Sequence, residues 1–374
     1  MAGIYLHIPF CKQACHYCNF HFTTSLRQKG ALVDALVQEA ALRTSYLEAA
    51  PVHTVYFGGG TPSLLEAGEL EAILDALRRH YPVDAGAELT LEANPDDITA
   101  ERLQHWKDLG INRLSIGVQS FFEEELRWMN RAHTAGHARG CIELSLAAGF
   151  SNLTIDLIYG SPLLSDARWK ENVDIATGYG INHLSCYALT VEEKTPLHQQ
   201  IGRHQQVDVD NDQQARQFLL LMEWLAAAGY EHYEVSNWAK PGFRSRHNSA
   251  YWKGVPYLGL GPSAHSFNGR ERSWNIANNA VYIRALTEGR LPDEKEALTR
   301  EQRLNEYLMI ALRTREGIDL NRAAALATEK EQQEIRRQLQ VFLREGLVQE
   351  TPSGYALTDA GMLRADGLAA DLFV

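Results

Sequence analysis

The sequence predicts an α/β fold built on a parallel sheet, with a smaller helical region toward the C-terminus. The main observation is that six short β-rich runs alternate with segments of helical periodicity. The β-rich runs are Ile4–Ile8, Thr54–Phe57, Glu88–Glu92, Arg113–Val118, Leu153–Ile158 and His183–Leu189. The helical patterns between them are Leu32–Leu47, Leu70–Leu77, Glu101–Leu109, Ala138–Ala148 and Trp169–Ala176. Such alternation implies right-handed crossovers, so we expect either an open sheet or a partial barrel.

The length of the chain predicts more than one structural region. With 374 residues it exceeds what a single hydrophobic core usually supports. We expect a core over residues 1–205, a continuation over 206–298 and a separate region over 299–374. In the last region, helical patterns precede a small hairpin around the turn at Thr351–Gly354, which is typical of a winged-helix shape.

Charge and hydropathy exclude several classes of function. Thirty-six basic residues against 47 acidic ones give a net charge of −11, which argues against non-specific attraction to nucleic acid or anionic membranes. The C-terminal region carries at least as many carboxylates as arginines, whereas a DNA-binding domain needs basic residues gathered on one face. A nucleic-acid-binding regulator is therefore the disfavoured alternative. No segment has the roughly 18 apolar residues of a membrane span, and no secretory leader is seen, so we expect a cytoplasmic protein.

Three of the five cysteines, Cys11, Cys15 and Cys18, lie within eight positions directly after the first predicted strand. Thiolates in this number bind soft metals, and three of them can hold three irons of a cubane while the fourth iron stays open. A closed zinc site is the alternative. It needs a fourth ligand, and the nearby candidates are His7, His16 and His21.

The C-x3-C-x2-C spacing, with Tyr17 before the third cysteine, resembles the radical S-adenosylmethionine superfamily. The glycine-rich stretch Gly58–Pro62 resembles the segment of that family that holds the methionine amino group. The resemblance implies a partial (β/α)6 barrel, a 4Fe-4S cluster on the three cysteines and S-adenosylmethionine at the open iron. It places Tyr17 against the adenine. The other cofactor contacts that it implies are Tyr5, Gly59, Gly60, Thr61, Glu92, Gln119, Arg131 and Asp156.

The positions of these residues along the chain agree with such a site. Glu92, Gln119 and Asp156 lie at the carboxyl ends of predicted strands, where a barrel collects its ligand-binding groups. A carboxylate there can accept hydrogen bonds from ribose hydroxyls or from an amine, and Arg131 can pair with a carboxylate through its planar fork. Taken alone, each of these residues is better explained as a strand-end charge that faces water.

Further motifs resemble one branch of the superfamily, which contains the oxygen-independent coproporphyrinogen III oxidases and the HemW heme chaperones. The oxidase branch carries a fourth cysteine where this chain has Phe20, and a longer N-terminal arm than the ten residues that precede Cys11. The segment from His247 to Trp252 reads H-N-x-x-Y-W, which resembles the signature of the chaperone branch. The resemblance therefore implies a heme chaperone without coproporphyrinogen dehydrogenase activity. Oxidative decarboxylation by a 5′-deoxyadenosyl radical is the alternative.

The same segment suggests where heme binds. His247 is a candidate iron ligand, and Tyr251 and Trp252 offer aromatic faces to cover an apolar macrocycle. His247 could instead hold a loop through hydrogen bonds, and His265 is a second, weaker candidate ligand. The partners that the resemblance implies are heme, apo-hemoproteins that receive it, an electron donor for the cluster and peripheral contact with membrane hemoproteins.

Overall fold

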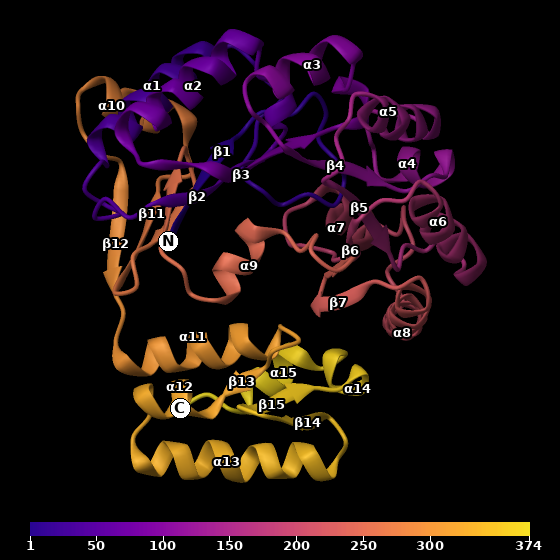
Figure 1. The fold of residues 1–374 in the computed structure, drawn as a ribbon. Helices are drawn as coiled ribbons and strands as arrows, with labels where there is room; N and C mark the ends of the chain where they lie inside the picture. The colour runs from indigo at the N-terminus through magenta and orange to yellow at the C-terminus, as the bar shows by residue number, and fades with distance from the viewer.

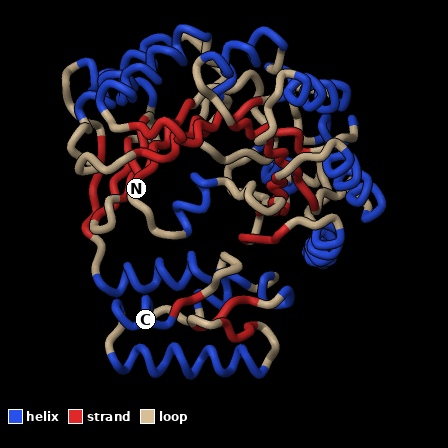
Figure 2. Tube along the Cα trace, viewed as in Figure 1, coloured by secondary structure: helices blue, strands red, loops and turns tan.

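A computed structural model describes all residues, 1–374, and contains two sheets. The larger sheet has twelve strands and is covered by helices on its outer face, and the smaller one has three strands in the C-terminal region (Figures 1 and 2). Six parallel strands in chain order form the middle of the large sheet, as predicted. They are β1 (Ala2–Ile8), β2 (Val52–Gly59), β3 (Val83–Ala93), β4 (Arg113–Gln119), β5 (Leu153–Tyr159) and β6 (His183–Ala188).

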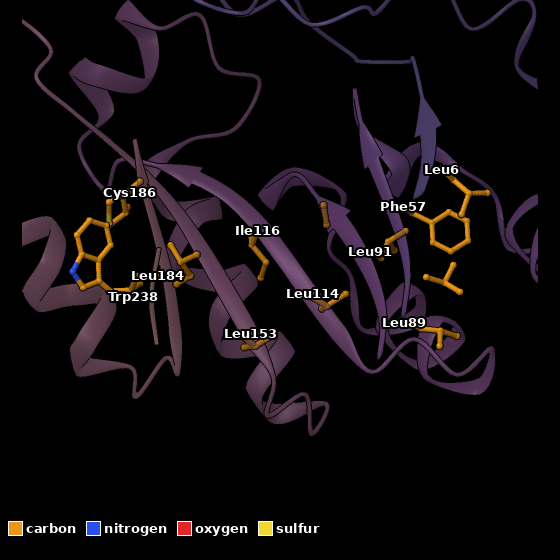
Figure 3. Packing of buried hydrophobic residues seen from close by; sticks show 14 of the residues in the cluster. Leu6, Phe57, Leu89, Leu91, Leu114, Ile116, Leu153, Leu184, Cys186 and Trp238 are labelled. Carbon is orange, nitrogen blue, oxygen red and sulfur yellow. The ribbon is translucent and has the colours of Figure 1, made fainter. Parts of the chain in front are cut away.

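Helices connect these strands and pack on the outer face of the curved sheet (Figure 1). Leu6, Phe57 and Leu91 are fully buried, and Figure 3 shows such side chains from successive strands within one core. Burial on both faces is typical of parallel sheets. The helices are α1 (Lys29–Leu42), α2 (Ala67–His80), α3 (Ala100–Asp108), α4 (Glu123–Trp128), α5 (Ala135–Ala147) and α6 (Asp166–Gly178).

Alternate positions of the same strands carry polar side chains, which form hydrogen bonds from one strand to the next. Tyr56 of β2 donates a hydrogen bond to Glu92 of β3, and Ser115 of β4 donates to Asp156 of β5. Since successive side chains of a strand point to opposite faces, these polar groups form the inner face of the curved sheet. The fold is thus the expected α/β partial-barrel type, with an apolar outer layer and a polar interior.

Six further strands extend the sheet at both edges. One of them is β7 (Glu231–Glu234). Next to β6 lie β8 (Asn237–Ala239) and then β7, while β9 (Tyr257–Leu260), β10 (His265–Phe267), β11 (Glu271–Asn275) and β12 (Asp293–Ala297) continue from β1. The edge strand β12 reads Asp-Glu-Lys-Glu-Ala, and such charges protect an exposed edge from pairing with another chain.

Four helices accompany these strands: α7 (Pro196–Gly202), α8 (Asn211–Ala227), α9 (Arg246–Trp252) and α10 (Asn279–Thr287). The short helix α9 lies against β1 and β2. Its first turn is fixed by Glu88 of β3, whose carboxylate accepts hydrogen bonds from the backbone N–H groups of Arg246 and His247. Helix α9 therefore covers part of the inner face of the sheet.

The C-terminal region has the winged-helix-like order that the sequence predicts. Its hairpin, β14 (Val348–Thr351) and β15 (Gly354–Leu357), pairs with β13 (Ile318–Asp319). Its helices are α11 (Arg300–Leu312), α12 (Leu320–Leu326), α13 (Glu329–Arg344), α14 (Asp359–Met362) and α15 (Ala365–Ala370). The division of the chain at residues 205 and 298 stays a prediction. No helix in the structure combines the length and apolar character needed to cross a membrane.

Candidate functional site

The loop after β1 brings all three clustered cysteines to the wall of one cavity of about 420 Å³. Thr61 Oγ1 donates a hydrogen bond to Cys11 Sγ at 3.4 Å, and Arg131 Nη1 donates to Cys15 Sγ at 3.2 Å. Burial raises the pKa of Cys11 to about 11 and also raises the pKa of Cys18. Both thiols are therefore protonated at neutral pH without a metal, and metal binding would release their protons.

The donor set fits a cluster better than a zinc ion. No three His, Cys, Asp or Glu side chains are grouped around a single point where one metal ion could bind. A cubane cluster does not require such a point, because each thiolate binds a different iron. None of His7, His16 and His21 lines the cavity of the cysteines. The imidazoles are bonded elsewhere, for example His16 Nδ1 to the Trp128 carbonyl at 2.9 Å.

Two carboxylates of the inner face, Glu92 and Asp156, line the same cavity. Glu92 accepts hydrogen bonds from Tyr56 Oη at 2.8 Å and from the Gly59 N–H at 3.2 Å. Burial raises the pKa of Glu92 to about 7 and that of Asp156 to about 6. A cationic or hydroxyl-rich ligand would favour their ionised forms. This is the chemistry that S-adenosylmethionine presents.

The glycines at the end of β2 let the chain pass very close to β1 and to the start of the cysteine loop. Gly59 has a φ of +105°, and a Cβ there would lie 2.5 Å from the His7 ring. A Cβ on Gly60 would lie 2.7 Å from the Phe10 carbonyl oxygen and 2.8 Å from that of Ile8. Because backbone atoms cannot move aside as a flexible side chain can, we expect only glycine to be tolerated at position 60.

Gln119 and Arg131 also line the smaller cavity, which holds the three cysteines. Gln119 ends β4 with a φ of +65°, a left-handed conformation that is uncommon outside glycine and is often found at functional sites. Arg131 Nη2 donates to Asn94 Oδ1 and to the Gly117 carbonyl, each at 2.8 Å. Its buried Nε has no partner. The guanidinium is thus held in place with one donor free.

A second, larger cavity of about 1050 Å³ adjoins the first. Asn19, Phe20, Gly59 and Glu92 line both cavities. Apart from these shared residues, the second cavity is rich in aromatic and imidazole groups from the barrel and in side chains from α11 and α12. They include Tyr5, His7, His21, Tyr251, Trp252, Tyr257, His265, Phe267, Tyr307, Ile310 and Leu326.

The structure does not bring His247 to this cavity. The imidazole is only 2% exposed, with Nδ1 2.8 Å from Thr54 Oγ1 and Nε2 2.9 Å from Tyr251 Oη. Burial lowers the pKa of His247 to about 3. Both ring nitrogens are engaged, so His247 here positions Tyr251, whose ring does reach the cavity. His265, by contrast, is exposed, lines the cavity and makes no side-chain hydrogen bond.

Every other cofactor-binding residue expected from the sequence lies at one of the two cavities. Glu92 lines both cavities, whereas Tyr5 lines the larger one, with its Oη 3.2 Å from His7 Nδ1. Sequence reasoning missed the contribution of the C-terminal helices, including Arg303, Tyr307 and Arg322. No local pattern could reveal it, because those residues meet the barrel only through tertiary packing.

The comparisons agree with this geometry. The family description "Radical SAM superfamily" matches residues 5–176, and "HemN C-terminal domain" matches residues 298–364. The fold is similar to that of the solved coproporphyrinogen III oxidase HemN from Escherichia coli. The TM-score is 0.83 at 23% identity, over 100% of this chain and 90% of that one. A curved parallel sheet whose first loop carries three cysteines beside a cofactor-sized cavity defines a radical SAM protein.

Proteins with similar sequences indicate the family within this superfamily. The chain is 37% identical over 99% of its length to the heme chaperone HemW of Mycobacterium tuberculosis, covering 94% of that protein. It is 31% identical to the heme chaperone HemW of Bacillus subtilis, over 97% of each chain. The chain therefore belongs to the HemW family within the radical SAM superfamily.

Proposed function

We propose that this protein binds heme and passes it to apo-hemoproteins, and that it holds a 4Fe-4S cluster and S-adenosylmethionine next to the heme. The observation that carries the proposal is the pair of adjoining cavities. One has the thiols and polar groups that suit the cluster and its cofactor. The other has the size, about 1050 Å³, and the aromatic lining that suit a macrocycle. Relatives named as heme chaperones support the same reading.

In the smaller cavity, Cys11, Cys15 and Cys18 would bind the cluster. When bound, the cluster and S-adenosylmethionine supply redox chemistry that no side chain offers. Arg131 would bring its positive charge and its one free donor, Nε, to the carboxylate of the cofactor. Ionised Glu92 would accept hydrogen bonds from the cofactor amine. The remaining contacts proposed here are Tyr5, Tyr17, Gly59, Gly60, Thr61, Gln119 and Asp156.

In the larger cavity, the Tyr251 and Trp252 rings would cover the macrocycle, and an imidazole would bind the iron. His265 is the better-placed ligand, because it is exposed to the cavity and free of hydrogen bonds. His247 stays a prediction, since its Nε2 becomes available only where Tyr251 moves away from it.

Coproporphyrinogen oxidation is the competing function. Phe20 argues against it, because it lies 68% exposed where both cavities meet and presents an aromatic ring instead of a thiol. An electron donor, contact with membrane hemoproteins, a cytoplasmic location and the absence of a nucleic-acid partner remain predictions.

The test uses anaerobically purified and reconstituted protein. We expect about four irons and four sulfides per chain, a Soret band on heme titration and transfer of heme to an apo-hemoprotein. Protein in which Cys11, Cys15 and Cys18 are all replaced by serine should lose the cluster. Stoichiometric zinc in protein kept anaerobic would exclude the cluster. Efficient conversion of coproporphyrinogen III to protoporphyrinogen would favour the oxidase.

The heme ligand is tested by comparing His265→Ala with His247→Ala. We expect His265→Ala to change the ligation spectrum and His247→Ala to keep it while weakening affinity through Tyr251. Tyr251→Leu and Trp252→Leu should weaken binding with the spectrum retained. If only His247→Ala lost the ligation spectrum, Tyr251 would have to move on heme binding and His265 would be excluded.

A further inference from the structure

The larger cavity carries an excess of positive charge, and one of its cations has no partner. Arg272, Arg303 and Arg322 line it, against Glu92 and Glu306. Three guanidinium groups against two carboxylates leave the cavity cationic even if Glu92 is ionised.

Two of the three arginines are already engaged. Arg272 Nε donates to Glu306 at 2.7 Å, so these two charges neutralise each other. Arg322 Nη2 donates to the Lys253 carbonyl at 3.3 Å, and its guanidinium carbon lies 4.6 Å from the centre of the Tyr307 ring.

Arg303 differs from both. Its side chain makes no hydrogen bond or ion pair in the structure, and its Nε is buried without a partner. A buried unpaired donor on a charged group is costly, and an anionic ligand would relieve that cost. A planar guanidinium fork matches a carboxylate in particular.

We propose that Arg303 of α11 binds a peripheral carboxylate of the macrocycle in the larger cavity. This inference rests on the proposed heme function and adds a recognition element to it. A porphyrin such as heme carries its propionates at one edge, while its faces are apolar. The cavity offers the matching pair of surfaces, aromatic side chains from the barrel and a free cation from the C-terminal region. The C-terminal region would thus orient the macrocycle.

The experiment compares heme with its dimethyl ester, in which both carboxylates lose their charge. Each is titrated by its Soret band into the parent protein, Arg303→Gln, Arg303→Lys and the control Arg336→Gln. Arg336 is an exposed arginine of α13 that makes no side-chain contact with a carboxylate. We expect the parent to bind the ester about tenfold more weakly than heme, since a charged hydrogen bond is lost.

Arg303→Gln should bind heme about tenfold more weakly than the parent and should bind the ester as the parent does. Arg303→Lys should fall between, because the charge remains but the fork is lost. Arg336→Gln should match the parent. If the parent bound heme and ester with equal affinity, the inference would be overturned and the heme function would stand. The same would follow if Arg303→Gln lost affinity for both ligands by the same factor. A parent protein that bound neither form would overturn both.

Discussion

At the scale of single residues, Glu92 combines burial with polar contacts in a way that a strand-end carboxylate facing water would not. The Tyr56 hydroxyl and the Gly59 N–H hold its two oxygens, and its pKa is raised to about 7 by burial. The side chain can therefore change charge near physiological pH. Motif position identified Glu92 from the sequence, but its pKa depends on packing between β2, β3 and the cysteine loop, which no sequence pattern specifies.

The raised pKa of Glu92 predicts how the stability of the cofactor-free protein depends on pH. Between about pH 4.5 and pH 7 the folded chain keeps a proton that the unfolded chain has released. The free energy of unfolding should therefore fall as pH rises through this window and stay low above it. Asp156, with its pKa raised to about 6, contributes in the same direction.

Thermal unfolding from pH 5 to pH 8 measures this dependence. Glu92→Gln should flatten the slope, and Glu223→Gln on the exposed face of α8 should leave it as in the parent. In the same variants, S-adenosylmethionine affinity should rise with pH in the parent and not in Glu92→Gln. Identical slopes in all three proteins would contradict the assigned pKa of Glu92.

At the scale of elements, the six central strands and five of the six helices that connect them could be predicted from β-rich runs and helical periodicity, whereas the six-residue helix α4 could not. The strands β8 to β12 could not, since they have three to five residues and β12 is almost entirely charged. Their place is set by tertiary contacts. One such contact is a buried polar cluster between α1, the loop after β9, β11 and α10.

Glu39 is the centre of that cluster. It is fully buried and accepts hydrogen bonds from Arg43 Nε at 2.7 Å, Asn275 Nδ2 at 2.8 Å, the Gly261 N–H at 2.9 Å and Tyr282 Oη at 2.5 Å. Without Glu39, Arg43 would keep only Asp293, whose Oδ2 lies 3.1 Å from Arg43 Nη1. The buried donors of Gly261, Asn275 and Tyr282 would also lose this acceptor, and both losses are costly.

Glu39→Ala should therefore lower the free energy of unfolding by about 3–5 kcal/mol, measured by chemical denaturation. The matched control is Glu71→Ala on the exposed face of α2, which should change stability by less than about 0.5 kcal/mol. A loss below about 1 kcal/mol for Glu39→Ala would show that water replaces the lost carboxylate and that the cluster does not hold this edge of the sheet together.

At the scale of the whole molecule, the two cavities differ in which parts of the chain build them. All residues that line the smaller cavity precede residue 193, whereas the larger one also needs α11 and α12 of the C-terminal region. The sequence motifs lie mainly in the first part of the chain. This explains why the residues around the smaller cavity could be predicted and the far wall of the larger cavity could not. The two binding functions should therefore be separable by substitution.

Ala325→Trp tests this separation. Ala325 is an exposed residue of α12 on the wall of the larger cavity, so an indole there would occupy space that the macrocycle needs. Heme affinity should fall at least about tenfold. Cluster content and S-adenosylmethionine affinity should stay unchanged, since Ala325 does not line the smaller cavity. Ala226→Trp, on an exposed position of α8, introduces the same side chain away from both cavities and should keep all three properties. Unchanged heme binding by Ala325→Trp would place the macrocycle elsewhere on the protein, and a parallel loss of the cluster would mean that the two cavities are coupled through the C-terminal region.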